Sequence, residues 1–241
     1  MKIITFPNDK GGTGKTTSAV NVADYLERQG YQVLLVDVDQ QHHATQLFLP
    51  QPKYTWYHAF TVPDIVSPDE CLYQVREDRA LWLLPAATSL VDVESVLSTH
   101  RDLQGLSRIV QGIGRKFDYV ILDAPPARDM LLLNALYLAD DVIIPVETSQ
   151  FAYNGAASML DLCGQMQCNI VGLLPTLYHA GQNADRVVLE ALQAHYPKLV
   201  LPPIRKNADL KTAQVLGQTI FEFAPRSSGA VDYARLGALY G

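Results

Sequence analysis

The sequence predicts an α/β fold in which a doubly wound, mostly parallel β-sheet is flanked by helices. Apolar runs of strand length, such as residues 33–36 and 119–122, are continuous rather than alternating. Such runs are typical of parallel strands that are covered on both faces. Segments with a helical period separate them, which favours right-handed crossovers. In sheets of this kind, ligands bind at the carboxyl ends of the strands.

The expected elements follow from these patterns. We expect strands near residues 2–6, 32–37, 80–84, 118–123, 141–146 and 170–175, with a short one near 199–202. We expect helices over residues 15–29, 89–115, 129–138, 153–167, 183–196 and 228–239. Gly30 follows the first helix, where a C-terminal cap belongs. Residues 48–79 are rich in proline and aromatic side chains, so we expect helical turns and loops there.

Composition narrows the class of protein. With 241 residues, 48% apolar and 18% charged, the chain is long and apolar enough for one globular domain spanning residues 1–241. No apolar run approaches the length of a membrane span, and the first residues form a strand rather than a signal peptide. Three scattered cysteines, Cys71, Cys163 and Cys168, favour the reducing cytosol over a disulfide framework or zinc site.

Charge is unevenly distributed. The net charge of −6 argues against a protein that coats nucleic acid. Residues 181–241 hold seven Lys/Arg and five Asp/Glu, a net charge of +2, whereas residues 1–180 hold twelve and twenty, a net charge of −8. A shift this small fits chance scatter as well as it fits a basic surface.

The strongest motif lies directly between the first strand and the first helix. It reads Lys10-Gly11-Gly12-Thr13-Gly14-Lys15-Thr16-Thr17. Glycines let consecutive backbone N–H groups turn inward around phosphate oxygens, and the helix N-terminus adds partial positive charge. Lys15 is expected to reach the β- and γ-phosphates, Thr16 to complete a Mg²⁺ site, and Thr17 to lie near the α-phosphate.

This loop departs from the ordinary phosphate-loop pattern. Asp9 stands where the first glycine usually is, and a second lysine, Lys10, follows it. A loop lysine is by default a solvated charge, but Lys10 lies close to the expected polyphosphate. At about 4 Å and an effective dielectric near 20, one charge pair contributes roughly 4 kcal/mol. Lys10 therefore has a large effect if it points at a nucleotide, in its own subunit or in a partner.

Three motifs together carry a family resemblance. The loop resembles the deviant Walker A motif of the ParA/MinD ATPases, a class of P-loop NTPase. Residues 34–41, Leu-Leu-Val-Asp-Val-Asp-Gln-Gln, resemble the second acidic motif of ParA and Soj proteins. Residues 119–126, Tyr-Val-Ile-Leu-Asp-Ala-Pro-Pro, resemble their Walker B motif, and residues 204–208 and 228–233 are similar to the end of ParA sequences. Because the chain begins at the first strand, the N-terminal helix-turn-helix of larger plasmid ParA proteins is expected to be absent.

The resemblance implies roles for individual residues. Lys15 is the phosphate-loop lysine, and Lys10 matches the signature lysine that crosses a nucleotide sandwich dimer to the partner's ATP. Asp39 matches the residue that orients the attacking water. Asp37 and Asp123 would support Mg²⁺, largely through waters. The adenine lies, in this family, near positions that correspond to Pro175-Thr176 and to residues 202–207, which include Arg205.

Other features depart from the ParA family pattern or argue against related groups of proteins. The family usually has proline at position 40 and often Gly-Asn at positions 42–43, where this chain has Gln40 and His42-His43. Adjacent histidines in an extended chain point apart, so surface histidines are favoured over a metal site. Residues 127–130 offer no cysteine for the iron–sulfur cluster of related reductases. The C-terminus lacks the basic amphipathic helix by which MinD relatives bind membranes.

Three functions compete on this sequence. The first is a partition ATPase of the ParA type: ATP forms a homodimer, the dimer binds DNA non-specifically, and a ParB-like partner stimulates hydrolysis, which moves plasmid or chromosome in a cytoplasmic, nucleoid-associated cycle. The second is an enzyme that activates a carboxylate with ATP, as dethiobiotin synthetase does. The third is a positioner of non-DNA cargo. The candidate DNA contacts are Arg186, Arg205, Lys206 and Lys211, among which Asp209 stands where some relatives carry arginine.

Overall fold

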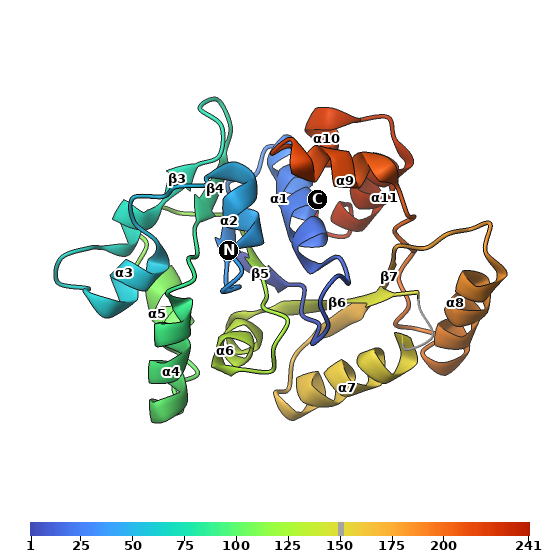
Figure 1. The fold of residues 1–241 in the computed structure, drawn as a ribbon, viewed down its shortest axis with the longest axis horizontal. Helices are drawn as coiled ribbons and strands as arrows, with labels where there is room; N and C mark the ends of the chain where they lie inside the picture. Colours follow the sequence, from blue (N-terminus) through green and yellow to red (C-terminus); the bar gives the residue numbers. More distant parts are fainter. Residues whose placement is uncertain (149–151) are drawn as a thin grey trace.

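A computed structural model describes residues 1–148 and 152–241 and confirms the doubly wound sheet (Figure 1). Its described strands are ordered β3-β4-β2-β5-β1-β6-β7. All neighbours are parallel except the short edge pair β3 and β4. The strands are β1 Lys2–Thr5, β2 Val33–Asp37, β3 Tyr73–Gln74, β4 Leu81–Leu84, β5 Tyr119–Asp123, β6 Asp141–Glu147 and β7 Ile170–Thr176.

Helices cover both faces of this sheet (Figure 1). Helices α1 and α9–α11 pack on one face, and α3–α6 pack on the other. The α-helices are α1 Lys15–Arg28, α2 His43–Phe48, α3 Trp56–Thr61, α4 Leu90–His100, α5 Gly105–Gln111, α6 Met130–Leu138, α7 Ala152–Gln165, α8 Asn183–His195, α9 Ala208–Val215, α10 Ile220–Phe223 and α11 Ser228–Gly237.

The two cores explain why the central strands are continuously apolar. Leu35 of β2 and Ile121 of β5 pack in the core under α1 and α11. Their neighbours Leu34 and Val120 pack in the opposite core under α3–α6. Successive side chains of a strand point to opposite faces of the sheet. When helices cover both faces, the residues that point to each face must therefore all be apolar.

The crossover of the chain places a crevice at the end of β1. From β1 the chain first builds β2, β4 and β5 on one side, and it then returns past β1 to build β6 and β7 on the other. Ligands of doubly wound sheets bind where the strand order reverses in this way. The loop of residues 6–14 starts at that carboxyl end and leads into α1. The topology therefore places the phosphate loop in the crevice.

The predicted cap of the first helix is confirmed. Gly30 has a φ of +96°, and its N–H donates to the carbonyl of Glu27 at 2.8 Å. The Tyr31 N–H donates to the Leu26 carbonyl at 3.3 Å. These two bonds close a Schellman motif, in which a left-handed glycine satisfies the last helical carbonyls.

The single helix predicted over residues 89–115 is wrong, because the structure divides this segment into α4 and α5. Arg101 adopts a left-handed conformation with φ +51°, and the Asp102 carboxylate accepts the N–H of Gln104 at 2.9 Å. Asn134 of α6 then accepts the Leu106 N–H at 3.0 Å, which fixes the first turn of α5. Tertiary bonding thus overrides a helical pattern that continues through the break.

The short strand predicted near residues 199–202 is reduced to one bridge between Leu173 and Val200. The Leu201 N–H donates to the Leu173 carbonyl at 2.8 Å, but Pro202 and Pro203 follow and have no N–H to continue the ladder. Within residues 48–79 the structure has α3 and a 3₁₀ turn at Pro68–Cys71, as expected, and also the short edge strand β3, which was not predicted. Three short helices, α2, α9 and α10, have no counterpart among the expected elements.

Candidate nucleotide-binding site

The phosphate loop has the backbone that its glycines predict. Gly12 and Gly14 have φ values of +76° and +86°, a region in which other residues are strained. The Thr176 hydroxyl, at the end of β7, donates to the Thr13 carbonyl at 2.8 Å. A Cβ on Gly14 would lie 3.5 Å from the Thr176 side chain. Strand β7 therefore braces the loop from the side opposite to β5.

Lys15 is buried at the start of α1, with only 7% of its surface exposed. Its ammonium donates to the Lys10 carbonyl at 2.7 Å and so spans the loop. Burial lowers the pKa of Lys15, while the carboxylates of Asp123, Asp39 and Asp9 oppose that decrease. A buried ammonium with one carbonyl partner is available to a phosphate group, which is the stronger acceptor.

Lys10 lies against helix α7 of its own chain. A Cβ on Gly155 would lie 3.3 Å from the Lys10 ammonium nitrogen, so the glycine leaves the space that this side chain uses. Beside it, the Asp9 carboxylate pairs with Arg128 at 3.2 Å, and Arg128 also donates to the Ser158 carbonyl at 2.6 Å. This network joins the phosphate loop to α7 and to the loop after β5.

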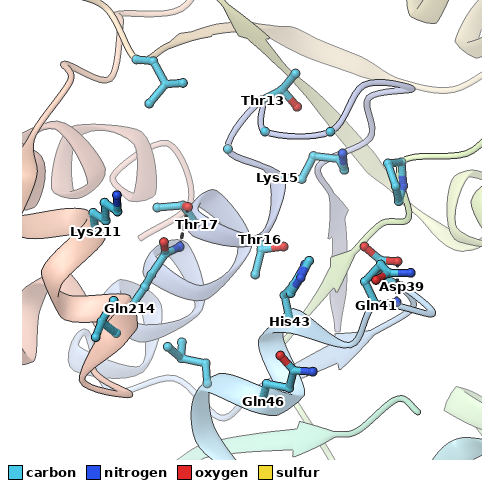
Figure 2. A pocket seen from close by; sticks show the side chains of 17 residues that line it. Thr13, Lys15, Thr16, Thr17, Asp39, Gln41, His43, Gln46, Lys211 and Gln214 are labelled. Atoms are coloured by element: carbon cyan, nitrogen blue, oxygen red, sulfur yellow. Dashed lines mark hydrogen bonds between the residues drawn. The ribbon is translucent and has the colours of Figure 1, made fainter. Parts of the chain in front are cut away.

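A cavity of about 880 Å³ opens in front of the loop (Figure 2). It is lined by the loop and the start of α1, by the segment that follows β2, and by α9, with Pro126 and Leu177 completing the wall. The lining residues are Gly11, Gly12, Thr13, Gly14, Lys15, Thr16, Thr17, Asp39, Gln41, His43, Gln46, Leu47, Pro126, Leu177, Lys211, Gln214 and Val215. The tertiary structure thus brings seven of the predicted phosphate-loop residues to one wall.

Asp37 is fully buried and holds the start of α2. One carboxylate oxygen accepts both the amide and the hydroxyl of Thr45 at 2.8 Å, and the other accepts the Asp39 N–H at 3.1 Å. Burial raises the pKa of Asp37 to about 6, although these hydrogen bonds oppose the increase. Both oxygens thus have protein donors, and Asp37 supports the site by fixing the turn that carries Asp39.

Asp123 is the carboxylate that lacks such partners. It is fully buried, and within the described residues neither of its oxygens has a hydrogen-bond partner of ordinary geometry. Burial and the nearby Asp37 raise its pKa well above the usual range, against the effects of Thr16 and Lys15. A buried carboxylate without a partner is costly unless a cation compensates it.

These residues fit ATP with Mg²⁺. The described residues contain no cluster of three or more His, Cys, Asp or Glu that would enclose a metal by themselves. Mg²⁺ is usually held by one or two protein oxygens together with substrate phosphates and water. Asp123 and Thr16 supply such oxygens beside the phosphate loop, and the metal would neutralise charge on the phosphates.

Asp39 lies at the cavity wall and is 6% exposed. One of its oxygens accepts the Gln41 N–H at 2.9 Å, which fixes the side chain across the turn. His42, in the next position, has a left-handed φ of +44°, where the family resemblance leads one to expect glycine. Position 42 therefore adopts the left-handed conformation that suits glycine, although the residue is His42.

The remaining predicted site residues are spread over the C-terminal part of the chain. Pro175 lies within β7 and lines neither this cavity nor a smaller adjoining one. Arg205 lines the smaller cavity, of about 120 Å³, and forms a two-pronged ion pair with Asp232. Arg186 is exposed on α8 and lies 3.9 Å from Glu190. Lys206 is exposed outside both cavities, whereas Lys211 lines both.

Sequence reasoning missed several residues of the cavity. Gln41 ends the second acidic motif and His43 lies two residues after it, so position alone could have included both. Gln214 and Val215 had no local signal, because α9, which carries them, meets Thr17 across 197 positions of the sequence.

Comparison with known proteins identifies the class to which this fold and site belong. Residues 1–173 match the AAA domain family. The chain is 35% identical to the chromosome-partitioning ATPase Soj of Thermus thermophilus, covering 98% of this chain and 94% of that protein. It is 31% identical to the sporulation initiation inhibitor protein Soj of Bacillus subtilis, covering 98% and 96%. The chain belongs to the ParA/Soj family of partition ATPases, and its cofactors are ATP and Mg²⁺.

Solved structures agree on the fold. A plasmid partition protein of Borrelia burgdorferi bound to AMPPNP superimposes with a TM-score of 0.85 at 24% identity, over 99% of this chain and 98% of that one. A cobyrinic acid a,c-diamide synthase of Mycobacterium smegmatis, solved with an ATP analogue and magnesium, has a TM-score of 0.82 at 28% identity, over 99% and 93%. Among the described residues, no helix is long and apolar enough to cross a membrane.

Proposed function

We propose that this chain is a partition ATPase of one domain, residues 1–241, that switches between a nucleotide-free monomer and an ATP-bound sandwich dimer. The observation that carries the proposal is a second lysine in the phosphate loop beside a second acidic motif. Lys10 lies in the loop against α7, Asp39 lies on the cavity wall, and the Soj relatives cover nearly the whole chain. In this proposal the ATPase is weak alone and is stimulated by a ParB-like protein.

Each polar residue has a defined task in the proposed cycle. Lys15 binds the β- and γ-phosphates, Asp39 orients the attacking water, and Lys10 crosses to the nucleotide of the partner subunit. Asp123 and Thr16 hold the metal, which neutralises charge that develops on the phosphates. Phosphoryl transfer needs positioning and charge stabilisation more than covalent chemistry, so such a set of residues is sufficient.

Non-specific DNA binding is proposed for the dimer. A monomer with a net charge of −6 binds DNA poorly, but two copies of one basic surface double the phosphate contacts. Lys206 is the best-placed of the four candidate residues, because it is exposed and lies outside the nucleotide cavity. Arg186 and Arg205 already lie near or pair with carboxylates in the monomer. The proposed setting is the cytoplasm, on the nucleoid.

A mobility shift with random-sequence duplex DNA tests this function. The protein is assayed at low and moderate salt with ATP, with ADP and without nucleotide, and Lys206→Ala is compared with the parent. Binding that requires ATP, weakens with salt and is reduced by Lys206→Ala supports the proposal. ATP hydrolysis without a shift under any condition contradicts DNA partition.

The second candidate is an enzyme that activates a carboxylate with ATP. The similarity to the diamide synthase structure favours it, since that enzyme is named for converting carboxylates to amides. The candidates differ in what accepts the γ-phosphate. If phosphate release requires a small carboxylic acid and does not respond to DNA, the synthase function replaces the partition function.

A further inference from the structure

Lys211 lies on the wall of the nucleotide cavity, a position that the sequence did not predict. It was a candidate DNA contact, but in the structure it lines both the nucleotide cavity and the smaller cavity beside it. The residue is solvent-exposed, and no ion pair of Lys211 occurs within residues 1–148 and 152–241. An unpaired ammonium on the wall of a polyphosphate site is placed to receive an anion rather than to pair within the chain.

Gln214, one turn further along α9, contacts the phosphate loop directly. Its amide nitrogen donates to the Thr17 hydroxyl at 2.7 Å, as the dashed line in Figure 2 shows. Residues three apart on a helix lie on the same face, so Lys211 and Gln214 present their side chains to one side of the cavity. Helix α9 thereby closes the wall that faces Thr17.

The start of α9 is fixed, so this wall does not depend on a free loop. Asn207 caps the helix by accepting the Asp209 N–H at 2.6 Å, and its amide nitrogen donates to the Ser228 hydroxyl at 2.9 Å. Leu210 and Ala213 of α9 are buried. Helix α9 is therefore anchored beside the loop before a nucleotide arrives, which reduces the entropy lost on binding.

The position of α9 indicates which end of the nucleotide this helix contacts. Lys15, with Asp123 and Asp39 as its charged neighbours, marks the end where the γ-phosphate and metal belong. Thr17 lies two residues further into α1, where the sequence leads us to expect the α-phosphate. We propose that Lys211 binds the α-phosphate of the nucleotide and that Gln214 is a positioning residue that orients the Thr17 hydroxyl toward the same group.

This proposal rests on the nucleotide site and not on DNA binding. It moves Lys211 from the proposed DNA surface to the nucleotide site. Helix α9, whose sequence carries no nucleotide-binding motif, then contributes to the affinity for adenine nucleotides.

Nucleotide affinities of the full-length protein test the role of Lys211. Calorimetry compares Lys211→Met with the parent for ATP, ADP and AMP, and with adenosine as a probe without phosphate. Removing a charge-assisted contact is expected to weaken binding of all three nucleotides by a similar factor, roughly tenfold, and to leave adenosine unchanged. The matched control is Lys198→Met, which removes an exposed lysine that lines neither cavity.

Two outcomes overturn the assignment of Lys211. Unchanged affinity for all three nucleotides, with a reduced DNA shift at saturating ATP, makes Lys211 the DNA contact that the sequence predicted. Weaker binding of ATP alone, with ADP and AMP unchanged, moves Lys211 to the γ-phosphate. Failure of the parent to shift DNA contradicts the proposed function, but the affinity ratios still report on Lys211.

A double-mutant cycle tests Gln214. Gln214→Leu and Thr17→Val are each expected to weaken ADP binding roughly three- to fivefold, and the double variant no more than the stronger single variant, because both remove one hydrogen-bonded unit. Melting temperatures without nucleotide are measured for all variants and are expected to match the parent. Additive losses, or a loss of apo stability in place of affinity, contradict the positioning role.

Discussion

Asp37 accepts two hydrogen bonds from Thr45, one from its amide and one from its hydroxyl, both at 2.8 Å. The same Thr45 hydroxyl oxygen accepts the Ala86 N–H at 2.9 Å, so the carboxylate at the end of β2 is tied to α2 and to the segment after β4. Asp123, in register with Asp37 on the adjacent strand, has no such donors within the described residues. Two neighbouring acidic residues thus have different roles.

Single substitutions of Asp37 and Asp123 are expected to separate the effect on stability from the effect on metal binding. Asp37→Ala leaves the Thr45 N–H without its acceptor and lowers the free energy of unfolding by about 1–3 kcal/mol. Asp123→Asn removes the carboxyl group that would hold the metal, so Mg²⁺ no longer strengthens ATP binding. Thermal melts with and without Mg²⁺·ATP measure both effects. Loss of the magnesium effect in Asp37→Ala, at unchanged stability, would reverse the assignment.

Lys15→Ala is expected to lose ATP binding and hydrolysis together. The ammonium is buried, and its hydrogen-bond partner within the described residues is the Lys10 carbonyl of the loop. Its removal leaves phosphate charge without a counterion. Calorimetry with ATP and a phosphate-release assay measure the two losses. Lys198→Ala is the control for loss of a lysine outside both cavities. Unchanged ATP affinity in Lys15→Ala is incompatible with the phosphate-loop assignment.

Lys10 and Asp39 are expected to separate dimer formation from chemistry. Lys10→Ala binds ATP as a monomer, because the contact it loses is to the partner's nucleotide. Asp39→Ala dimerises with ATP but does not hydrolyse it, because only the orientation of water is lost. Light scattering with ATP, together with phosphate release, checks both variants. If both dimerise and hydrolyse like the parent, the assigned roles are wrong.

The pH dependence of stability is expected to include Cys71. Its thiol is buried and donates to the Thr55 carbonyl at 3.1 Å, and burial raises the pKa of Cys71 from 9.0 to about 11. Between these values the unfolded thiol ionises while the folded thiol stays protonated. The contribution of Cys71 to stability is therefore complete below about pH 9 and is lost as the pH rises through about 11.

Urea unfolding of the parent and of Cys71→Ala measures this contribution. The difference between their free energies of unfolding should shrink as the pH rises from about 9 to about 11. Cys71→Ala also leaves a small cavity, but that cost does not depend on pH. A difference that stays constant over this range would mean that the folded thiol ionises as easily as the unfolded one.

Local sequence was sufficient for the sheet and the phosphate loop. Continuous apolar runs require strands covered on both faces, and glycines at positions 12 and 14 permit the positive φ values that the loop adopts. Both are properties of short segments, so they could be predicted without knowing what the segments contact. Asp39 and Asp123 directly follow or end such strands, but their roles were implied by the family resemblance and stay predictions.

Tertiary structure decided the rest of the site. The break between α4 and α5 depends on Asn134, and the wall of the cavity depends on Thr176 and Gln214, which reach the loop from β7 and α9. Lys211 looked like a surface cation in the sequence and became part of the cavity only when α9 packed beside α1. Hydrogen bonds between distant segments have no period and no spacing in the sequence, so only the folded chain determines which polar residues meet.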